Sequence, residues 1–302
     1  GKAKIQLNAL LNQHGISNTF NGKYKIGRKY DTLKSVIGQY GSAKIAMDEE
    51  EIILHISTKN IKLELNLRRG LAIQSLAFAS HDMEPCIGTL PHGYFSYISL
   101  GADYYSGGVV VELPLQRRRI TDLEKVEPTF LIKDNGNIEI HAEIRTQFGS
   151  IIKVVEVSTN SEKVSLSYNF SKWDKIIGSV RLGIMTLLNQ FSHKNTKLLC
   201  SNGGENNEIF DFSGEINHIK PASTLVSSSR GLGATTGKIK IINNEKSINL
   251  QWDPSECAVM PMLYNESFNS RNLSRVFFSI KEVDDTSKHL SDISAFSLVI
   301  ST

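Results

Sequence analysis

Alternation of apolar and polar residues dominates this sequence from Glu51 to its end. The stretches "NIEIHAEIRT" (137–146) and "KVSLSYNF" (163–170) follow a period of two, and "GGVVVELP" (107–114) is a short β-branched run. A period of two places successive side chains on opposite faces of a strand. About fourteen such stretches occur, and no helical pattern longer than about two turns follows residue 45. The pattern predicts a mainly β protein.

Turn residues separate these predicted strands. Asn, Asp and Gly gather in "DNGN" (134–137), "STNSEK" (158–163) and "INNEK" (242–246), as tight turns require. So many mainly antiparallel strands would not form one flat sheet, and two large sheets packed face to face are the economical solution. The sequence has neither a repeat of fixed period nor a Pro/Ser-rich linker, which argues against a propeller or a two-domain split. We therefore expect one large two-sheet antiparallel supersandwich over residues 46–302.

The first 45 residues differ from the rest because they carry two short helical patterns. The stretch from Lys2 to Gln13 has apolar residues at helical spacing, namely Ile5, Leu7, Leu10 and Leu11. The stretch from Asp31 to Tyr40 begins with a possible Asp31 cap and ends before Gly41. We expect residues 1–45 to form a helical lead-in segment to the β domain.

Composition narrows the class of protein. The chain has 302 residues, 40% of them hydrophobic, and a formal charge of +3. The basic residues are scattered, so a continuous face for nucleic acid is not expected. Three widely spaced cysteines (Cys86, Cys200 and Cys257) predict buried free thiols in a reducing compartment. Without a long apolar run or a signal-peptide pattern, we expect a cytoplasmic protein that contacts neither nucleic acid nor membrane.

Two stretches of the sequence suggest a cofactor or metal site, but neither has the pattern that such a site requires. The stretch "SSSRGLGATTGKIKI" (227–241) lacks the spacing of a phosphate-binding loop and leads into a strand rather than a helix. The acidic stretch 282–292, with Glu282, Asp284, Asp285 and Asp292, could hold a hard cation, but a solvated loop is the simpler interpretation. We therefore expect no cofactor and no metal.

The candidate site begins at "PHGYFSYISLGADYYSGG" (91–108), which combines aromatic side chains with His, Asp and glycines. Sugars present apolar ring faces and a rim of hydroxyls, so a sugar site needs flat aromatics beside polar groups. The alternative is that these aromatics are ordinary core. The candidate catalytic residues are His92, Asp103 and Glu112. The candidate substrate-binding residues are Tyr94, Tyr104 and Tyr105, together with Glu205 from "NGGENN" and Trp252 and Asp253 from "QWDPSEC".

Four stretches carry a resemblance to a known family. They are "RLGIMTLL", "NGGENNEIFDFSGEINH", "STLVSSSRGLGATTGKIKI" and "RVFFSIKEVDDT". Together they resemble the C-terminal β-sandwich of family 57 glycoside hydrolases and related α-mannosidase-type enzymes, which is similar to the galactose-mutarotase-like supersandwich. The similarity covers about residues 45–302. In that family the catalytic residues belong to an N-terminal barrel that these 302 residues lack, so the resemblance implies carbohydrate association without catalysis here.

Two main functional hypotheses follow. The first is a non-catalytic domain of a glycoside hydrolase, whose partners are an oligo- or polysaccharide and an N-terminal catalytic domain. The second is a stand-alone mutarotase or epimerase, in which His92 is the acid and Glu112 or Asp103 the base. A third, a hydrolase, would need two facing carboxylates among Asp103, Glu112, Glu205 and Asp253.

Overall fold

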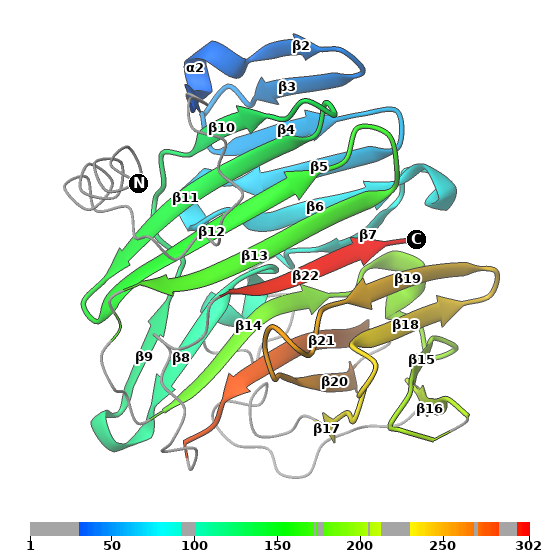
Figure 1. Ribbon diagram of the computed structural model, residues 1–302. Helices are drawn as coiled ribbons and strands as arrows, with labels where there is room; N and C mark the ends of the chain where they lie inside the picture. The colour runs from blue at the N-terminus through cyan, green and yellow to red at the C-terminus, as the bar shows by residue number, and fades with distance from the viewer. Residues whose placement is uncertain are drawn as a thin grey trace, which may run out of the picture.

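The protein is mainly β in the computed structural model, as the sequence predicts. The structure describes residues 30–91, 101–171, 173, 178–204, 206–212, 230–268, 271–283 and 295–302. Within them lie 22 β-strands, one short α-helix and five short 3-10 helices (Figure 1). The strands form one ten-stranded sheet and two six-stranded sheets, which we call sheets A, B and C.

Sheet A forms one whole layer of the sandwich. All its neighbouring strands are antiparallel. In spatial order they are β1 (Asp31–Thr32), β10 (Thr129–Ile132), β11 (Ile138–Thr146), β12 (Gly149–Val157), β13 (Lys163–Ser171), β22 (Phe296–Ser301), β19 (Lys246–Gln251), β18 (Lys238–Asn243), β15 (Lys197–Cys200) and β16 (Glu208–Asp211).

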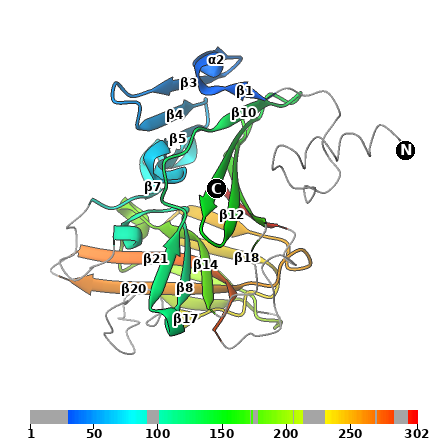
Figure 2. The same ribbon diagram turned by 90° about the vertical axis from the view of Figure 1, so that its left-hand side faces the viewer.

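Sheets B and C together form the other layer. Sheet B contains β2 (Gly38–Tyr40), β3 (Ala43–Met47), β4 (Ile53–Ser57), β5 (Ile61–Asn66), β6 (Ala72–Phe78) and β7 (Pro85–Gly88). Sheet C contains β17 (Arg230–Gly231), β20 (Met260–Phe268), β21 (Arg271–Lys281), β14 (Ser179–Thr186), β8 (Val109–Leu113) and β9 (Arg118–Thr121). In Figure 2, β5 and β7 of sheet B and β20 and β21 of sheet C lie on one side, and β12 and β18 of sheet A lie on the other.

The second layer is divided at a seam, which the sequence did not predict. Among the residues that the structure describes, two isolated bridges link sheets B and C, Ile73 to Ser106 and Ile87 to Leu187. At the seam the hydroxyl of the buried Ser106 donates to the carbonyl of Gly88 and accepts from the amide of Thr186 at 3.1 Å. The predicted two-layer supersandwich is confirmed, with one layer built from two sheets.

The predicted helix from Asp31 to Tyr40 is wrong in its extent. The described part of the lead-in has only the four-residue helix α2 (Leu33–Val36), with β1 before it and β2 after it. Val36 and Ile37 are β-branched and Gly38 follows them, so the chain leaves the helix after one turn. The predicted helix from Lys2 to Gln13 lies outside the described residues.

The alternation of apolar and polar residues along the strands of sheet A explains which side chains form the main core. On β11 the side chains of Ile138, Ile140 and Ile144 are buried, while Glu139 and Glu143 between them point outward. The same alternation on β13 and β22 fills the space between the layers. Sheet A therefore has one apolar and one polar face, as expected for an antiparallel sheet with a single covered side.

A buried ion pair interrupts this apolar core. Lys153 faces inward on β12, and its Nζ lies 2.9 Å from Oδ2 of Asp122, with both side chains fully buried. Lys153 also donates to the carbonyl of Gly70 at 2.8 Å, and Asp122 Oδ1 accepts from the amide of Val109 at 2.8 Å. The pair thus connects sheet A, the turn before β6 in sheet B, and β8 in sheet C.

The backbone packs closely around this ion pair. Gly70 has φ +58°, and a Cβ atom there would lie 1.8 Å from the carbonyl oxygen of Asp122, so only glycine fits. Burial, together with the Asp122 carboxylate, raises the pKa of Tyr168 well above its usual value. The phenol therefore stays protonated and donates to the carbonyl of Gly107 at 2.9 Å, which attaches sheet A to the seam.

The prediction that the three cysteines are buried free thiols is confirmed. Cys86, Cys200 and Cys257 are buried free thiols. Burial raises the pKa of the Cys86 thiol to about 12, which keeps it in the unreactive protonated form. Within the described ranges, no helix has the length and apolar character needed to cross a bilayer.

We predict that removing one partner of the buried pair destabilises the protein severely. Asp122→Ala leaves the Lys153 ammonium buried without its carboxylate, and the free energy of unfolding should fall by about 3 to 5 kcal/mol. The double variant Asp122→Leu, Lys153→Met removes both charges and should recover most of this loss. Urea unfolding of the three proteins measures both effects. A loss below about 1 kcal/mol in the single variant contradicts the prediction.

A second prediction concerns His81, which ends the 3-10 helix η2 (Ala79–His81) and is buried beside Phe78 and Phe191. Burial lowers the pKa of His81 below 6.5, Lys246 lowers it further, and Glu162, Asp82 and the backbone of Ser247 act in the opposite direction.

Since the unfolded chain takes up this proton more readily, the stability contribution is full above pH 6.5 and is lost progressively as the pH falls below that value. Urea unfolding across this range should show a smaller slope for His81→Phe than for wild type. His55 lies elsewhere, on β4, where it is half-buried and pairs with Glu64 at 3.3 Å, and His55→Gln is the control for the loss of one histidine. Equal slopes for wild type and His81→Phe would refute the assignment.

Candidate functional site

Sheet C carries a buried cluster on each of its two faces. Val109 and Val111 on β8 and Val276 on β21 belong to the main core between the layers. Their neighbours Val110 and Phe277 belong to a second, smaller cluster, so they point away from the main core. We call this side the outer face of sheet C. Polar side chains from the same strands share it and form the candidate site.

A row of charged side chains crosses this outer face. Arg119 on β9 donates a hydrogen bond to Glu112 on β8 and forms an ion pair with it. Glu112 is the cross-strand partner of Ser179 on β14, whose hydroxyl donates to Oε2 of Glu282 at 3.1 Å. Arg181, also on β14, donates to the same oxygen at 2.8 Å. The strand register therefore brings two arginine–carboxylate pairs into one row.

The row is partly open to solvent. The side chain of Arg181 is 4% exposed, whereas its partner Glu282 is 37% exposed. Arg119 and Glu112 lie between these values, at 16% and 21%. Each carboxylate is oriented by an arginine and is partly exposed, and Oε1 of Glu282 also accepts a hydrogen bond from the hydroxyl of Ser279. The row can thus bind a ligand that carries neighbouring hydrogen-bond donors and acceptors.

Apolar side chains occupy the rest of the outer face. The 3-10 helix η3 (Gly101–Tyr104) places the ring of Tyr104 in this second cluster, where it is 4% exposed. The cluster consists of Leu90, Tyr104, Val110, Ile184, Tyr264, Leu273 and Phe277. Tyr104 thus supports the outer face from within and offers little ring surface for stacking in this conformation.

Tyr105 has different surroundings from its neighbour. It is half-buried, its hydroxyl accepts a hydrogen bond from Nε of Arg69 at 3.2 Å, and the guanidinium carbon of Arg69 lies 5.8 Å from the ring centre. Arg69 ends the 3-10 helix η1 (Leu67–Arg69), which follows β5 of sheet B. Tyr105 therefore contacts the sheet B side of the seam, while Tyr104 packs on sheet C.

Two other predicted residues lie away from the charged row. Trp252 is buried in the main core with its ring edge-on to Phe278 at 5.2 Å. Asp253 is exposed, and hydrogen bonds from the side chain and backbone of Ser255 lower the pKa of its carboxyl group. The stretch "QWDPSEC" thus combines a core residue with a turn. The structure does not bring it together with Glu112.

Four predicted residues have no described side chain. His92, Tyr94 and Glu205 lie outside the described residues, and Asp103 is described only through the backbone of η3. Glu112 is thus the one member of the predicted catalytic set whose side-chain contacts are described.

The acidic stretch 282–292 is described only at its start. Glu282 is bound by Arg181, whereas Asp284, Asp285 and Asp292 lie outside the described residues. Among the side chains that the structure describes, no group of three or more His, Cys, Asp or Glu is placed to hold a metal ion.

Sequence reasoning missed most of the row. Arg119 was only one of the scattered basic residues, Arg181 was not assigned to a site, and Glu282 was considered only within the acidic stretch 282–292. One signal was available. Arg181 interrupts the apolar strand "SVRLGIMTLL", and a charged residue inside an apolar run is normally buried with a partner.

Comparison with known proteins defines the class of fold. No protein-family model and no curated protein matches this sequence. The structure resembles a galactose mutarotase-like protein from Clostridium acetobutylicum with a TM-score of 0.50 and 10% identity, covering 86% of this chain and 97% of that one. This likeness identifies a galactose mutarotase-like β-sandwich fold.

Two longer proteins are also similar. A TPR-domain containing protein from Parabacteroides distasonis has a TM-score of 0.48 and 10% identity over 82% of this chain. A GH36 alpha-galactosidase from Geobacillus stearothermophilus has a TM-score of 0.46 and 8% identity over 85% of this chain. This chain spans only 46% and 40% of their lengths. The narrower resemblance to family 57 glycoside hydrolases stays a prediction.

We predict that the two adjacent tyrosines respond differently to truncation. Tyr104→Ala opens a hole in the second cluster and should lower the free energy of unfolding by about 3 kcal/mol or more. Tyr105→Ala removes one hydrogen bond and a cation–π contact, and should cost about 1 to 2 kcal/mol. Thermal and urea unfolding measure both, and Tyr105→Ala is the matched control. Equal losses would contradict the different surroundings of the two rings.

Proposed function

We propose that this chain is a carbohydrate-binding β-sandwich domain that holds a glycan on the outer face of sheet C and does not itself cleave it. The observation that carries the proposal is the row of Arg119–Glu112 and Arg181–Glu282 pairs, partly open to solvent, on the outer face of a galactose mutarotase-like sandwich.

The chemistry of the row matches the rim of a sugar. Each sugar hydroxyl donates one hydrogen bond and can accept two, and a carboxylate beside a guanidinium offers an acceptor next to a donor. Because the arginines already orient both carboxylates, little side-chain entropy is lost when a ligand binds. In this proposal Glu112 and Glu282 accept from sugar hydroxyls, and Arg119 donates to them.

The other predicted residues are not part of the described row. His92, Tyr94, Asp103 and Glu205 remain candidate ligand-binding residues on the sequence pattern alone, and Tyr105 lies at the seam beside Arg69. The sequence resemblance to the C-terminal β-sandwich of family 57 glycoside hydrolases supports a non-catalytic role beside an N-terminal catalytic domain. The ligand would be an oligo- or polysaccharide. The ion pair between Glu112 and Arg119 supports binding rather than proton transfer, because that carboxylate is already engaged.

One observation favours a second candidate, a stand-alone mutarotase or epimerase. This chain matches 97% of the length of the galactose mutarotase-like protein, so the sandwich accounts for nearly all of that protein. In this alternative His92 is the acid and Glu112 or Asp103 is the base, and the reaction is the exchange of the anomeric hydroxyl between the two faces of the ring.

Calorimetric titration with an α-glucan and mannan panel tests the proposal. We expect wild type to bind at least one glycan, and Glu112→Gln to weaken that binding about tenfold, because the ion pair and a charge-assisted hydrogen bond are lost. Glu143→Gln, on the outward side of β11 in sheet A, is the matched control and should bind as wild type does.

Two outcomes decide against the proposal. If wild type binds no glycan in the panel, the binding function is wrong. If wild type speeds the anomerisation of a free sugar in a polarimeter, and Glu112→Gln abolishes that activity, the mutarotase alternative is correct instead.

A further inference from the structure

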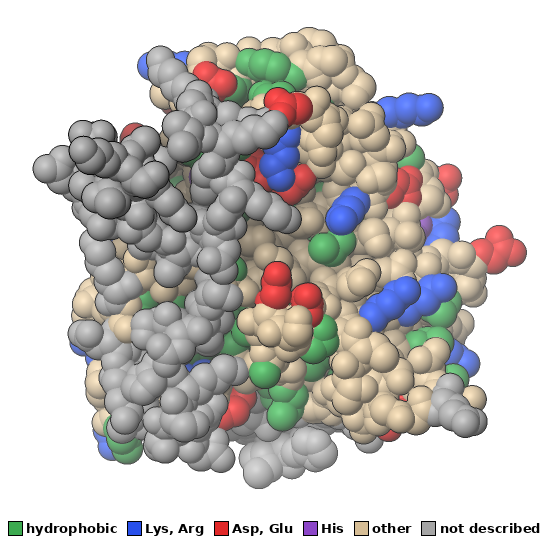
Figure 3. Space-filling model, in the orientation of Figure 1, with side chains coloured by type: hydrophobic (Ala, Val, Ile, Leu, Met, Phe, Trp, Pro, Cys, Tyr) green, Lys and Arg blue, Asp and Glu red, His purple; other side chains and the backbone are tan. Residues whose placement is uncertain are grey.

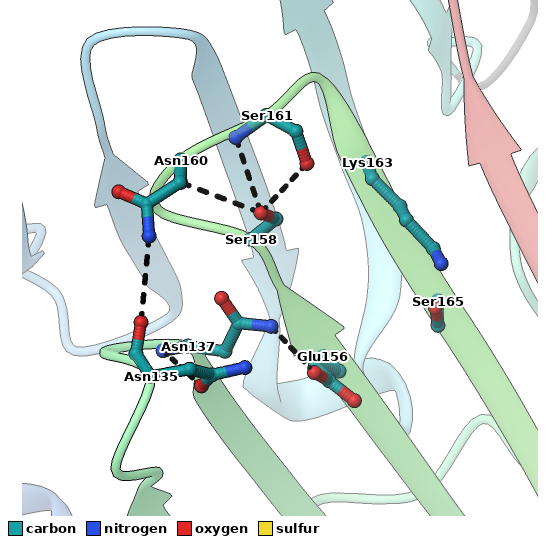
Figure 4. A pocket seen from close by; sticks show the side chains of 8 residues that line it. All are labelled: Asn135, Asn137, Glu156, Ser158, Asn160, Ser161, Lys163 and Ser165. Atoms are coloured by element: carbon teal, nitrogen blue, oxygen red, sulfur yellow. Dashed lines mark hydrogen bonds between the residues drawn. The ribbon is translucent and has the colours of Figure 1, made fainter.

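The turns of two successive hairpins lie side by side at one end of sheet A. The turn 134–137 precedes β11, and the turn 158–162 follows β12. Because β11 and β12 pair from Ile138 opposite Val157 onward, both turns lie at the same end of the sheet. They enclose an open cavity of about 320 Å³ on the outward side of the sheet (Figure 4).

Every side chain that lines this cavity is polar. Asn137 and Asn160 come from the two turns, while Glu156 and Ser165 come from the adjoining strands β12 and β13. Lys163 and Ser165 lie across the hollow from Asn160 in Figure 4. The formal charges of Glu156 and Lys163 cancel, so the lining is neutral. Figure 3 shows this side of the molecule, where small polar side chains and backbone make up most of the visible described surface.

Hydrogen bonds within the turns fix much of this lining in advance. Ser158 Oγ accepts from the backbone amides of Asn160 and Ser161 at 3.4 and 3.2 Å. Asn135 Oδ1 accepts from the amide of Asn137 at 3.0 Å, and Asn137 Nδ2 donates to Glu156 at 2.8 Å. A ligand would therefore meet a site that is largely preformed.

The lining excludes several kinds of ligand. An apolar molecule would find no apolar side chain. A hard cation would need several free oxygens, but the two oxygens of Glu156 accept from Asn137 and Lys133, each at 2.8 Å, and the Lys163 ammonium would repel it. An anion would meet one lysine opposed by Glu156. Carboxamides and hydroxyls both donate and accept, which suits a neutral polyhydroxylated ligand.

We propose that this cavity binds a neutral polyhydroxylated ligand of the size of a single sugar unit. Its volume lies at the lower end of the range for ligand pockets, about 300 to 1,000 Å³. The Lys163 ammonium and the Asn160 amide donate to hydroxyls, and Ser165 forms the floor. The site lies in the opposite layer from the outer face of sheet C, so the two sites do not depend on each other.

An NMR titration of the full chain with glucose tests the proposal. We expect saturable shifts of the backbone amides in residues 134–137 and 158–163. Lys163→Met should weaken binding about tenfold through loss of a charge-assisted hydrogen bond. Ser165→Phe should abolish it, because the ring fills the hollow while phenylalanine remains a favourable strand residue. Lys240→Met, outward on β18 of the same sheet, is the matched control.

The outcomes separate this site from the one on sheet C. Glu112→Gln should leave the titration unchanged, whatever becomes of glycan binding on sheet C. The proposal is wrong if the backbone amides of the two turns show no shifts up to about 100 mM glucose. A dissociation constant of that size corresponds to a binding free energy of only about 1.4 kcal/mol. It is also wrong if Ser165→Phe, folded with a wild-type melting temperature, binds glucose normally, or if inorganic phosphate saturates the site and glucose does not.

Discussion

The pairing of Lys153 with Asp122 is the constraint on which the arrangement of the three sheets depends. Two opposite charges lie at full burial in an otherwise apolar core, so each requires the other at hydrogen-bonding distance. Their remaining hydrogen bonds go to the turn that carries Gly70 and to the amide of Val109, in different sheets. A shift of any one sheet against the others would break this network, and the low dielectric makes such a shift costly.

From this pair the structure leads directly to the charged row. The Val109 amide is held by Asp122 at the start of β8, so the strand leaves the seam in a defined register. Val109 and Val111 then face the core, and Glu112 is turned to the outer face beside Arg119. Successive side chains of β8 point to opposite faces of the sheet. By fixing Val109, the buried ion pair therefore also fixes the face on which Glu112 lies, although it does not contact Glu112.

The two proposed sites use different chemistry because they lie on different kinds of surface. The outer face of sheet C has apolar neighbours and nearly buried arginines, so its hydrogen bonds are charge-assisted and directional. The cavity on sheet A lies between turns, where asparagine and serine satisfy the backbone, and its hydrogen bonds are mostly neutral. The first arrangement favours a firmly oriented ligand, and the second favours weaker binding.

The sequence by itself determined the mainly β class, the antiparallel sandwich and the turns, because alternation such as Ile138, Ile140 and Ile144 is a local signal. It did not determine that Asp31–Tyr40 would hold one helical turn between two strands, since pairing with β3 and β10 outweighs weak helix propensity. Only the tertiary structure decided that Arg181 would meet Glu282, 101 residues away. The apolar run around Arg181 indicates that it has a partner but not which one, because partners at that separation depend on strand order and register, which arise from packing the whole core.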